Sequence, residues 1–267
     1  MTPADVFAER KYEPFCGNTV LAAINALADF SHSKAMADLV IAGRWKGELL
    51  VTLGKVGPPR YANFIGRYKD DPDLSVRQAV AAALGLIDNE TIAVPVLIQL
   101  LSRGDKKEDF AVRWEAGSSL AKVAGRKGSE GVRRRLTDLL LERNPMTAVL
   151  AARALAAVGD ARGLEKLREL TSHGDAAVRQ EAVLALGEAA DTGSREVLVR
   201  RLKDDSLTVR GCAIYALGRL GDPSLIPILR KAVEESSGYE EKYGLQAFDL
   251  RETLQEAITA AQKSRGR

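Results

Sequence analysis

The sequence predicts an all-α solenoid built from about eight stacked helical hairpins. Three observations lead to this fold class: a repeated motif, apolar residues spaced as on one face of a helix, and turn residues between the periodic segments. The motif is clearest at residues 209–222, which read VRGCAIYALGRLGD. Related segments begin at Val76, Val112 and Val178. Since one hairpin cannot bury its apolar face alone, stacking of neighbours is expected to form one continuous core.

Weaker copies of the motif extend the repeat over the rest of the chain. They begin at Thr19, Trp45, Thr147 and Leu250. The eight starts therefore fall at 19, 45, 76, 112, 147, 178, 209 and 250, and the spacing that recurs most is 31 residues. We expect a single solenoid over residues 1–260, followed by a basic tail at 261–267.

The pattern within each copy is helical. Apolar residues fall at offsets 0, +4, +7, +8 and +11 from the start, which places them on one face of a helix. Glycine at offset +12 is expected to end the helix in the left-handed conformation, and acidic or hydroxyl residues before the start are expected to cap it. The glycines are Gly57, Gly159 and Gly221, and the capping candidates are Asp73, Ser75, Asp175, Ser206 and Asp249.

The V-R-x-x-A-x-x-A-L-G-x-x-G-D pattern of residues 209–222 resembles the short HEAT-like repeat first named for phycobilisome lyases. The resemblance covers nearly all of residues 1–260. It implies a right-handed α-α superhelix in which the V-R helices line the inner, concave face. It is specific for the fold and weak for function, because this repeat occurs in many unrelated scaffolds.

Composition narrows the class of partner. The 39 basic and 36 acidic residues leave a net charge of +3, too balanced to indicate nucleic acid by itself. No apolar run reaches the roughly 18 residues of a membrane span. Residues 1–15 lack the basic and apolar regions of a signal peptide, so we expect a cytoplasmic protein with no membrane contact.

A basic residue recurs at offset +1 of the repeats. A row of cations is one way to bind phosphates, but acidic residues precede most of these positions. We therefore interpret the pattern as a structural ladder of Arg–Asp pairs between neighbouring turns. Its basic members are Lys46, Arg77, Arg113, Arg179, Arg210 and Arg251, and its acidic members are Asp73, Asp109, Asp175, Asp205 and Asp249.

Offsets +2, +6 and +10 form a second stripe, which the core does not need. A stripe that only faces water would carry Lys, Glu and Gln, whereas this one carries aromatic, aliphatic and arginine side chains, the usual anchors of protein interfaces. The alternative is that some of these residues are buried against the next repeat. The candidate partner-binding residues are Trp114, Tyr215, Arg153, Val149, Leu184, Lys122 and Arg219, with Glu115 at the margin of the stripe.

The sequence predicts no catalytic residue, metal site or cofactor. His32 and His173 are the only histidines and neither precedes a glutamate, which excludes the di-iron site of the HEAT-like deoxyhypusine hydroxylases. Neither G-x-S-x-G nor G-K-[ST] occurs. Cys16 and Cys212 are isolated thiols, too few for a disulfide framework or a metal site.

We therefore expect a scaffold that binds another protein along its concave face. The resemblance also implies an alternative, a phycobilin lyase subunit or tetrapyrrole-handling protein that acts on a bilin–protein complex. Its contacts would come from Trp114, Tyr215, Glu115 and Arg153. A nucleic-acid-binding HEAT-like protein is a third alternative, which the acidic and apolar character of the stripe disfavours.

Overall fold

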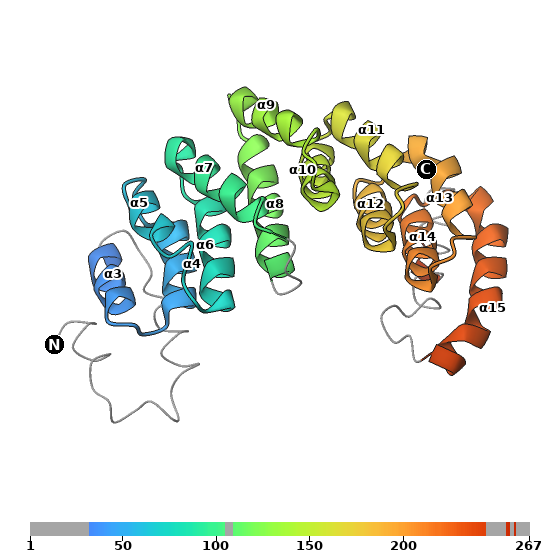
Figure 1. Ribbon diagram of the computed structural model, residues 1–267, viewed down its shortest axis with the longest axis horizontal. Helices are drawn as coiled ribbons and strands as arrows, with labels where there is room; N and C mark the ends of the chain where they lie inside the picture. Colours follow the sequence, from blue (N-terminus) through green and yellow to red (C-terminus); the bar gives the residue numbers. More distant parts are fainter. Residues whose placement is uncertain (1–31, 105–108, 244–254, 257–258, 260–267) are drawn as a thin grey trace. The chain divides into compact units, whose positions relative to one another are not determined.

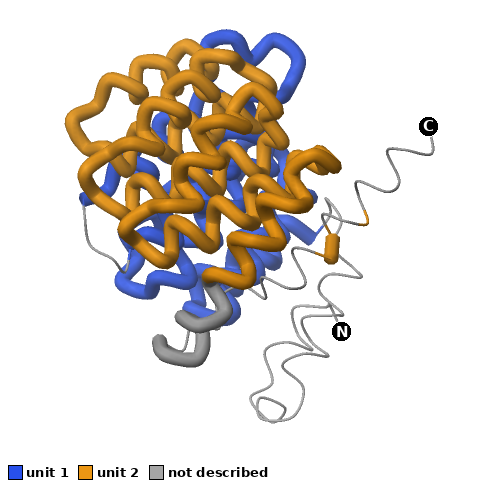
Figure 2. Tube along the Cα trace, turned by 90° about the vertical axis from the view of Figure 1, so that its right-hand side faces the viewer, with its two compact units in different colours: residues 1–132 blue, residues 133–267 orange. Residues whose placement is uncertain are grey.

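The computed structural model describes residues 32–104, 109–243, 255–256 and 259. Within these residues helices are the only regular secondary structure and no strand occurs, which confirms the predicted fold class. The chain divides into two compact units, residues 1–132 and 133–267 (Figure 2). The helix α9 contains the boundary between them. No helix among the described residues is long and apolar enough to cross a membrane.

The first unit consists of two layers of helices (Figure 1). One layer holds α4, α6 and α8, which pack side by side in chain order, and the other holds α5 and α7. The helix α3 packs on α4. Their bounds are α3 Ser33–Ile41, α4 Lys46–Val56, α5 Tyr61–Gly66, α6 Leu74–Leu86, α7 Glu90–Leu101, α8 Phe110–Ala124 and α9 Glu130–Leu139.

The second unit repeats the arrangement. The helices α10, α12 and α14 form one layer, and α11, α13 and α15 form the other. We call the layer of α4, α6 and α8 in the first unit, and that of α10, α12 and α14 in the second, the inner layer, and the other layer of each unit the outer layer. Short 3-10 turns, η4 and η5, lead into α13 and α15. The bounds are α10 Pro145–Ala157, α11 Ala161–Leu170, α12 Ala176–Glu188, η4 Thr192–Ser194, α13 Arg195–Arg201, α14 Leu207–Arg219, η5 Pro223–Leu225 and α15 Ile226–Tyr243.

The inner-layer helices coincide with the predicted repeat starts. Five of the starts, at 76, 112, 147, 178 and 209, lie two residues after the first residue of a helix. Trp45 immediately precedes α4. The starts at Thr19 and Leu250 lie outside the described residues. In this repeat four of the five predicted apolar positions are buried, namely Val178, Ala182, Ala185 and Leu186, so the repeat motif marks the core.

Two of the predicted helix caps are present. The Asp73 carboxylate accepts a hydrogen bond from the Ser75 N–H at 2.8 Å, and Asp175 accepts one from Ala177 at 2.9 Å. Such a cap stabilises a helix by about 1 kcal/mol. Ser75 is thus the donor of a capped turn and not itself the cap.

The prediction for Ser206 was wrong in its chemistry. Ser206 occupies the N-cap of α14, but its hydroxyl makes no capping bond. Its own N–H instead donates to the carboxylates of Asp204 and Asp205, at 3.0 Å each. Asp249 lies outside the described residues.

The glycines at offset +12 behave in two ways. Gly159 and Gly221 have φ of 75° and 64°, the predicted left-handed conformation. Gly57 has φ of −72°, so the prediction was wrong there. A Cβ on Gly57 would collide with the carbonyl oxygen of Leu53, which explains the glycine by a close approach.

A second glycine of the motif, at offset +9, was not interpreted from the sequence. A Cβ on Gly54 would lie 2.5 Å from the Ala83 carbonyl oxygen, and one on Gly187 would lie 2.6 Å from the Ala216 Cα. Each of these glycines faces offset +7 of the next inner-layer helix. The Leu-Gly pair of the repeat therefore allows successive inner helices to approach closely.

Candidate interaction surface

The basic residue at offset +1 reaches forward to the next repeat, as Arg179 shows most fully. Its Nη2 and Nε donate to both carboxylate oxygens of Asp204, at 2.7 and 3.0 Å, and Nη2 also reaches Asp205 at 2.5 Å. Its Nη1 donates to the carbonyls of His173 and Gly174. Burial alone would raise the pKa of Asp204, but hydrogen bonds led by that from Arg179 lower it to about 2. This bidentate pair links α12 to the loop before α14.

The first unit has the same arrangement. Arg77 Nη2 lies 2.8 Å from the carboxylate of Asp109, and both side chains are mostly buried. Arg77 Nη1 also donates to the carbonyls of Asp71 and Pro72. One repeat earlier, Lys46 pairs with the Asp71 carboxylate at 3.1 Å. In both units, then, these cations hold the loop that precedes the next inner-layer helix.

Two other arginines at this offset bind backbone. Arg113 is only 3% exposed, and its Nε donates to the carbonyl of Leu101 at 2.9 Å. Arg210 donates to the carbonyl of Asp204. Side chains engaged in this way hold the fold together, and they are not placed as a phosphate-binding row.

The acidic residues just before these arginines have another role. Asp73 and Asp175 accept N–H groups of the first turn of their own helices. The hydroxyl and the N–H of Ser75 lower the pKa of Asp73. The acidic partners of Arg77 and Arg179 come from the following repeat. Arg251 and Asp249 lie outside the described residues.

The stripe at offsets +2, +6 and +10 lies at the surface of both units. Trp114, Leu184 and Tyr215 are half-buried, although core positions in the same helices are fully buried. Lys122 and Arg219, at offset +10, are exposed. Each unit thus has an aromatic residue on an inner-layer helix, with a basic residue one or two turns further along the same helix.

Val149 is the exception, and its assignment to the stripe was wrong. Val149 is 0% exposed, and every residue from Thr147 to Ala152 is buried. This end of α10 therefore has no surface stripe, and Val149 belongs to the core.

Glu115 and Lys122 form a weak ion pair on α8. Their nearest charged atoms are 3.8 Å apart, and the Lys122 side chain is 53% exposed. A pair of this kind contributes at most about 1 kcal/mol, so it does not fix Lys122 in place.

Arg153 is held by two glutamates of α12. Its Nη2 donates to Glu188 at 2.7 Å, and its Nη1 lies 3.6 Å from Glu181 Oε2. Glu181 is only 8% exposed, and its Oε2 has no hydrogen-bond partner among the described residues. Burial raises the pKa of Glu181, against the opposing effect of Arg153. Burial likewise raises the pKa of the Cys212 thiol to about 12, with a contribution from the charge of Glu181.

Replacing Glu181 with glutamine is expected to stabilise the protein at neutral pH by about 1 kcal/mol. The folded state raises the pKa of Glu181, so the wild type loses stability as pH rises through that value and the carboxyl ionises in its buried site. The variant cannot ionise there, and the difference is expected to shrink in acid. Urea unfolding near pH 4 and near pH 7.5 measures it. Glu188→Gln, at a more exposed carboxylate, is the control and is expected to show little change.

Arg126 has a structural role that the sequence did not indicate. Its guanidinium donates to the carbonyls of Gly85 at 2.9 Å and Ile87 at 3.1 Å, and so closes the C-terminal end of α6. The residues are about forty positions apart, so no local pattern connects them. Positive charge at a helix C-terminus is stabilising, because the helix dipole is negative there.

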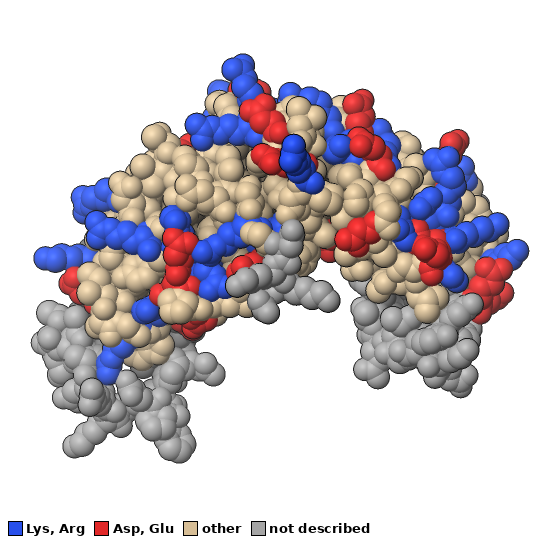
Figure 3. Space-filling view, in the orientation of Figure 1, with Lys and Arg blue, Asp and Glu red and all other residues tan. Residues whose placement is uncertain are grey.

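The described residues contain no group of three or more His, Cys, Asp or Glu side chains placed to hold a metal ion. Figure 3 shows basic and acidic side chains interspersed on the face in view, within each unit. A surface of mixed sign is expected from the nearly equal numbers of basic and acidic residues, 39 and 36.

Comparison with known proteins agrees with the two-layer repeat. The family described as HEAT repeats matches residues 164–247. The chain is therefore similar to HEAT-like repeat proteins. Comparison with curated protein sequences gives no significant match.

Several solved structures align with most of the chain. The X-ray structure of YibA from Escherichia coli aligns with a TM-score of 0.51 at 17% identity, over 96% of this chain and 100% of that one. An engineered protein aligns at 25% identity with a TM-score of 0.42, over 76% and 96% of the two chains. A designed armadillo repeat protein aligns at 21% identity with a TM-score of 0.40, over 76% and 98%. The similarity to YibA concerns the fold alone.

Proposed function

We propose that this HEAT-like protein is a scaffold that binds another protein through the surface stripe of its inner-layer helices. The observation that carries the proposal is the partial exposure of Trp114, Leu184 and Tyr215 at offsets that the core does not use. A partner that covers large apolar side chains removes their surface from water, which favours binding. Aromatic residues often contribute most of the binding energy. Neighbouring charges such as Lys122 and Arg219 would surround these anchors with a polar rim.

Handling of a bilin, as in proteins with the phycobilisome-lyase type of repeat, takes second place. That function would need a cation for the propionate groups, and Arg153 is the basic residue among the four expected to contact the pigment. Glu188 and Glu181 already hold this guanidinium, so a propionate would have to displace a glutamate. Titration with phycocyanobilin tests this alternative directly, since binding would change the visible absorbance of the pigment.

Replacing Trp114 and Tyr215 together with alanine is expected to reduce capture of the partner by about tenfold or more, because loss of each anchor typically costs more than 1 kcal/mol. The measurement compares wild-type and variant protein as bait in extract from the native host, with quantitative mass spectrometry of what each retains.

Leu141→Ala supplies the control. Leu141 is 87% exposed but lies outside the inner-layer helices, so its loss removes a similar apolar surface away from the stripe. Circular dichroism checks that all variants remain helical. Equal capture by the wild type and the Trp114/Tyr215 variant would refute the proposal.

A further inference from the structure

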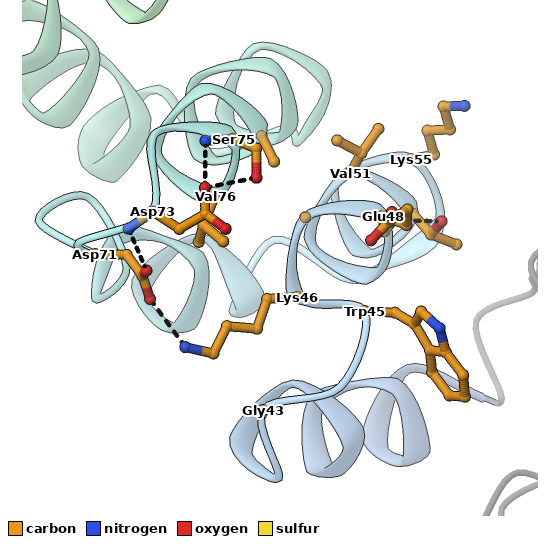
Figure 4. Close-up of a pocket in the computed structure, with 13 residues that line it drawn as sticks. Gly43, Trp45, Lys46, Glu48, Val51, Lys55, Asp71, Asp73, Ser75 and Val76 are labelled. Carbon is orange, nitrogen blue, oxygen red and sulfur yellow. Dashed lines mark hydrogen bonds and ion pairs between the residues drawn. The ribbon is translucent and has the colours of Figure 1, made fainter. Parts of the chain in front are cut away.

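A pocket of about 740 Å³ lies between α4 and α6 in the first unit (Figure 4). One wall is α4, which presents Glu48, Val51 and Lys55. Asp71 and Asp73, before α6, lie across from them. The pocket has the size of typical ligand sites and is open to one side, so it can receive side chains of a macromolecule.

The charges of the pocket fall into two groups. Lys46 pairs with Asp71 at 3.1 Å, and Asp73 is engaged in capping α6. Glu48 and Lys55 are exposed, and neither forms an ion pair within the part of the chain that the structure describes. These two opposite charges are seven residues apart on α4, or about 10 Å along its axis. Val51 lies between them on the pocket wall.

Trp45 lines the pocket in an unfavourable backbone conformation. It has φ of 43° and ψ of 40° at the N-cap of α4 and makes no capping bond through its side chain. Serine, aspartate or asparagine would cap this helix better by about 1 kcal/mol, and a bulky residue with positive φ is strained. A half-buried indole is kept here at the expense of helix stability.

Gly47 leaves space in the same pocket. A Cβ there would lie 3.6 Å from the Cβ of Ala79, an ordinary contact, so packing does not require glycine. Any longer side chain would extend into the space between α4 and α6. Gly47 and Trp45 both make α4 less stable than other residues would, and both line the pocket.

We propose that the pocket between α4 and α6 binds an amphipathic helix of a partner protein, with a basic and an acidic residue seven positions apart and an apolar residue between them. This inference rests on the proposed scaffold function and names the chemistry of its partner. The basic residue would face Glu48, the acidic residue would face Lys55, and the apolar residue would pack on Val51 and Trp45. The spacing matches because both helices rise by the same amount per residue.

The test uses fluorescein-labelled helical peptides that carry leucine between two positions seven residues apart. Those two positions hold Arg and Glu, two Arg, or two Glu. Fluorescence anisotropy with the full chain is expected to show that the Arg/Glu peptide binds about threefold to tenfold more tightly than the others. Lys55→Glu is expected to shift the preference to the peptide with two Arg, and Glu48→Lys to the peptide with two Glu.

A matched pair of variants tests the location. Gly47→Leu is expected to abolish peptide binding by filling the pocket, whereas Gly47→Ala should retain it, since its Cβ makes only an ordinary contact. Absence of binding by every peptide, or the same order of affinities in the charge variants, would overturn the proposal. Loss of partner capture on Trp114/Tyr215 replacement is measured separately. If it persists while the peptides fail, only the pocket proposal is wrong.

Discussion

Alanine in place of Gly187 is expected to lower the free energy of unfolding by about 1 to 3 kcal/mol or more. Its Cβ would lie 2.6 Å from the Cα and 2.7 Å from the Cβ of Ala216 on α14. A backbone atom cannot rotate away as the end of a long side chain can, so α12 and α14 would have to separate. Urea unfolding followed by circular dichroism measures the loss.

Gly211→Ala provides the matched control one helix away. Gly211 lies inside α14, and a Cβ there would meet no atom within 4 Å. Alanine is a better helix former than glycine, so this variant is expected to gain up to about 1 kcal/mol. An equal effect of both substitutions would show that close helix packing is not the reason for glycine at offset +9.

Replacing Arg179 with alanine is expected to destabilise the protein by about 3 kcal/mol, because it removes the partner of a buried carboxylate. The Asp204 side chain is only 1% exposed, and after the substitution Arg201 at 3.1 Å would be its remaining cation. The lost hydrogen bonds to the carbonyls of His173 and Gly174 add to the effect. Thermal or urea unfolding at neutral pH measures it.

The same pair predicts a pH dependence. The folded state lowers the pKa of Asp204 from 3.8 to about 2. The ionised carboxylate therefore contributes its full share of the folding stability above the pKa of the unfolded state, and this share is lost as pH falls through about 2. The stability difference between wild type and Arg179→Ala is therefore expected to narrow in strong acid. Arg195→Ala is the control. Arg195 pairs with Asp222 at 3.3 Å, and the two side chains are 45% and 35% exposed. The expected loss of stability is therefore below about 1 kcal/mol. Equal losses in the two variants would contradict the importance of burial.

Much of the fold could be predicted because the pattern that defines each repeat lies within a short stretch of sequence. The spacing of Val178, Ala182 and Leu186 places them on one helix face, and Asp175 marks where that helix begins. The candidate surface stripe was found by removing the predicted core positions from each helix, since the remaining positions must face elsewhere. Trp114 and Tyr215 are accordingly half-buried at the surface.

This prediction of exposed positions failed where contacts with neighbouring helices decide which residues are buried. Val149 has the same offset as Trp114, yet it is fully buried, as is its whole segment of α10, which packs against α11 and α12. Helical periodicity describes one helix at a time and carries no information about the elements that pack against it. The same limit applies to Glu181, which has the same offset, +3, as Glu115 at the stripe margin but is buried beside Arg153.

The sequence by itself determined the class of fold, the inner-layer helices and the list of side chains that the core leaves over, because these depend on periodicity within about thirty residues. Only the tertiary structure decided which carboxylate each arginine binds, as with Arg179 and Asp204. It also decided why Gly54 and Gly187 must lack a side chain, and where the space beside Trp45 and Gly47 opens. These features depend on distances between helices, which are set by packing of one repeat on the next.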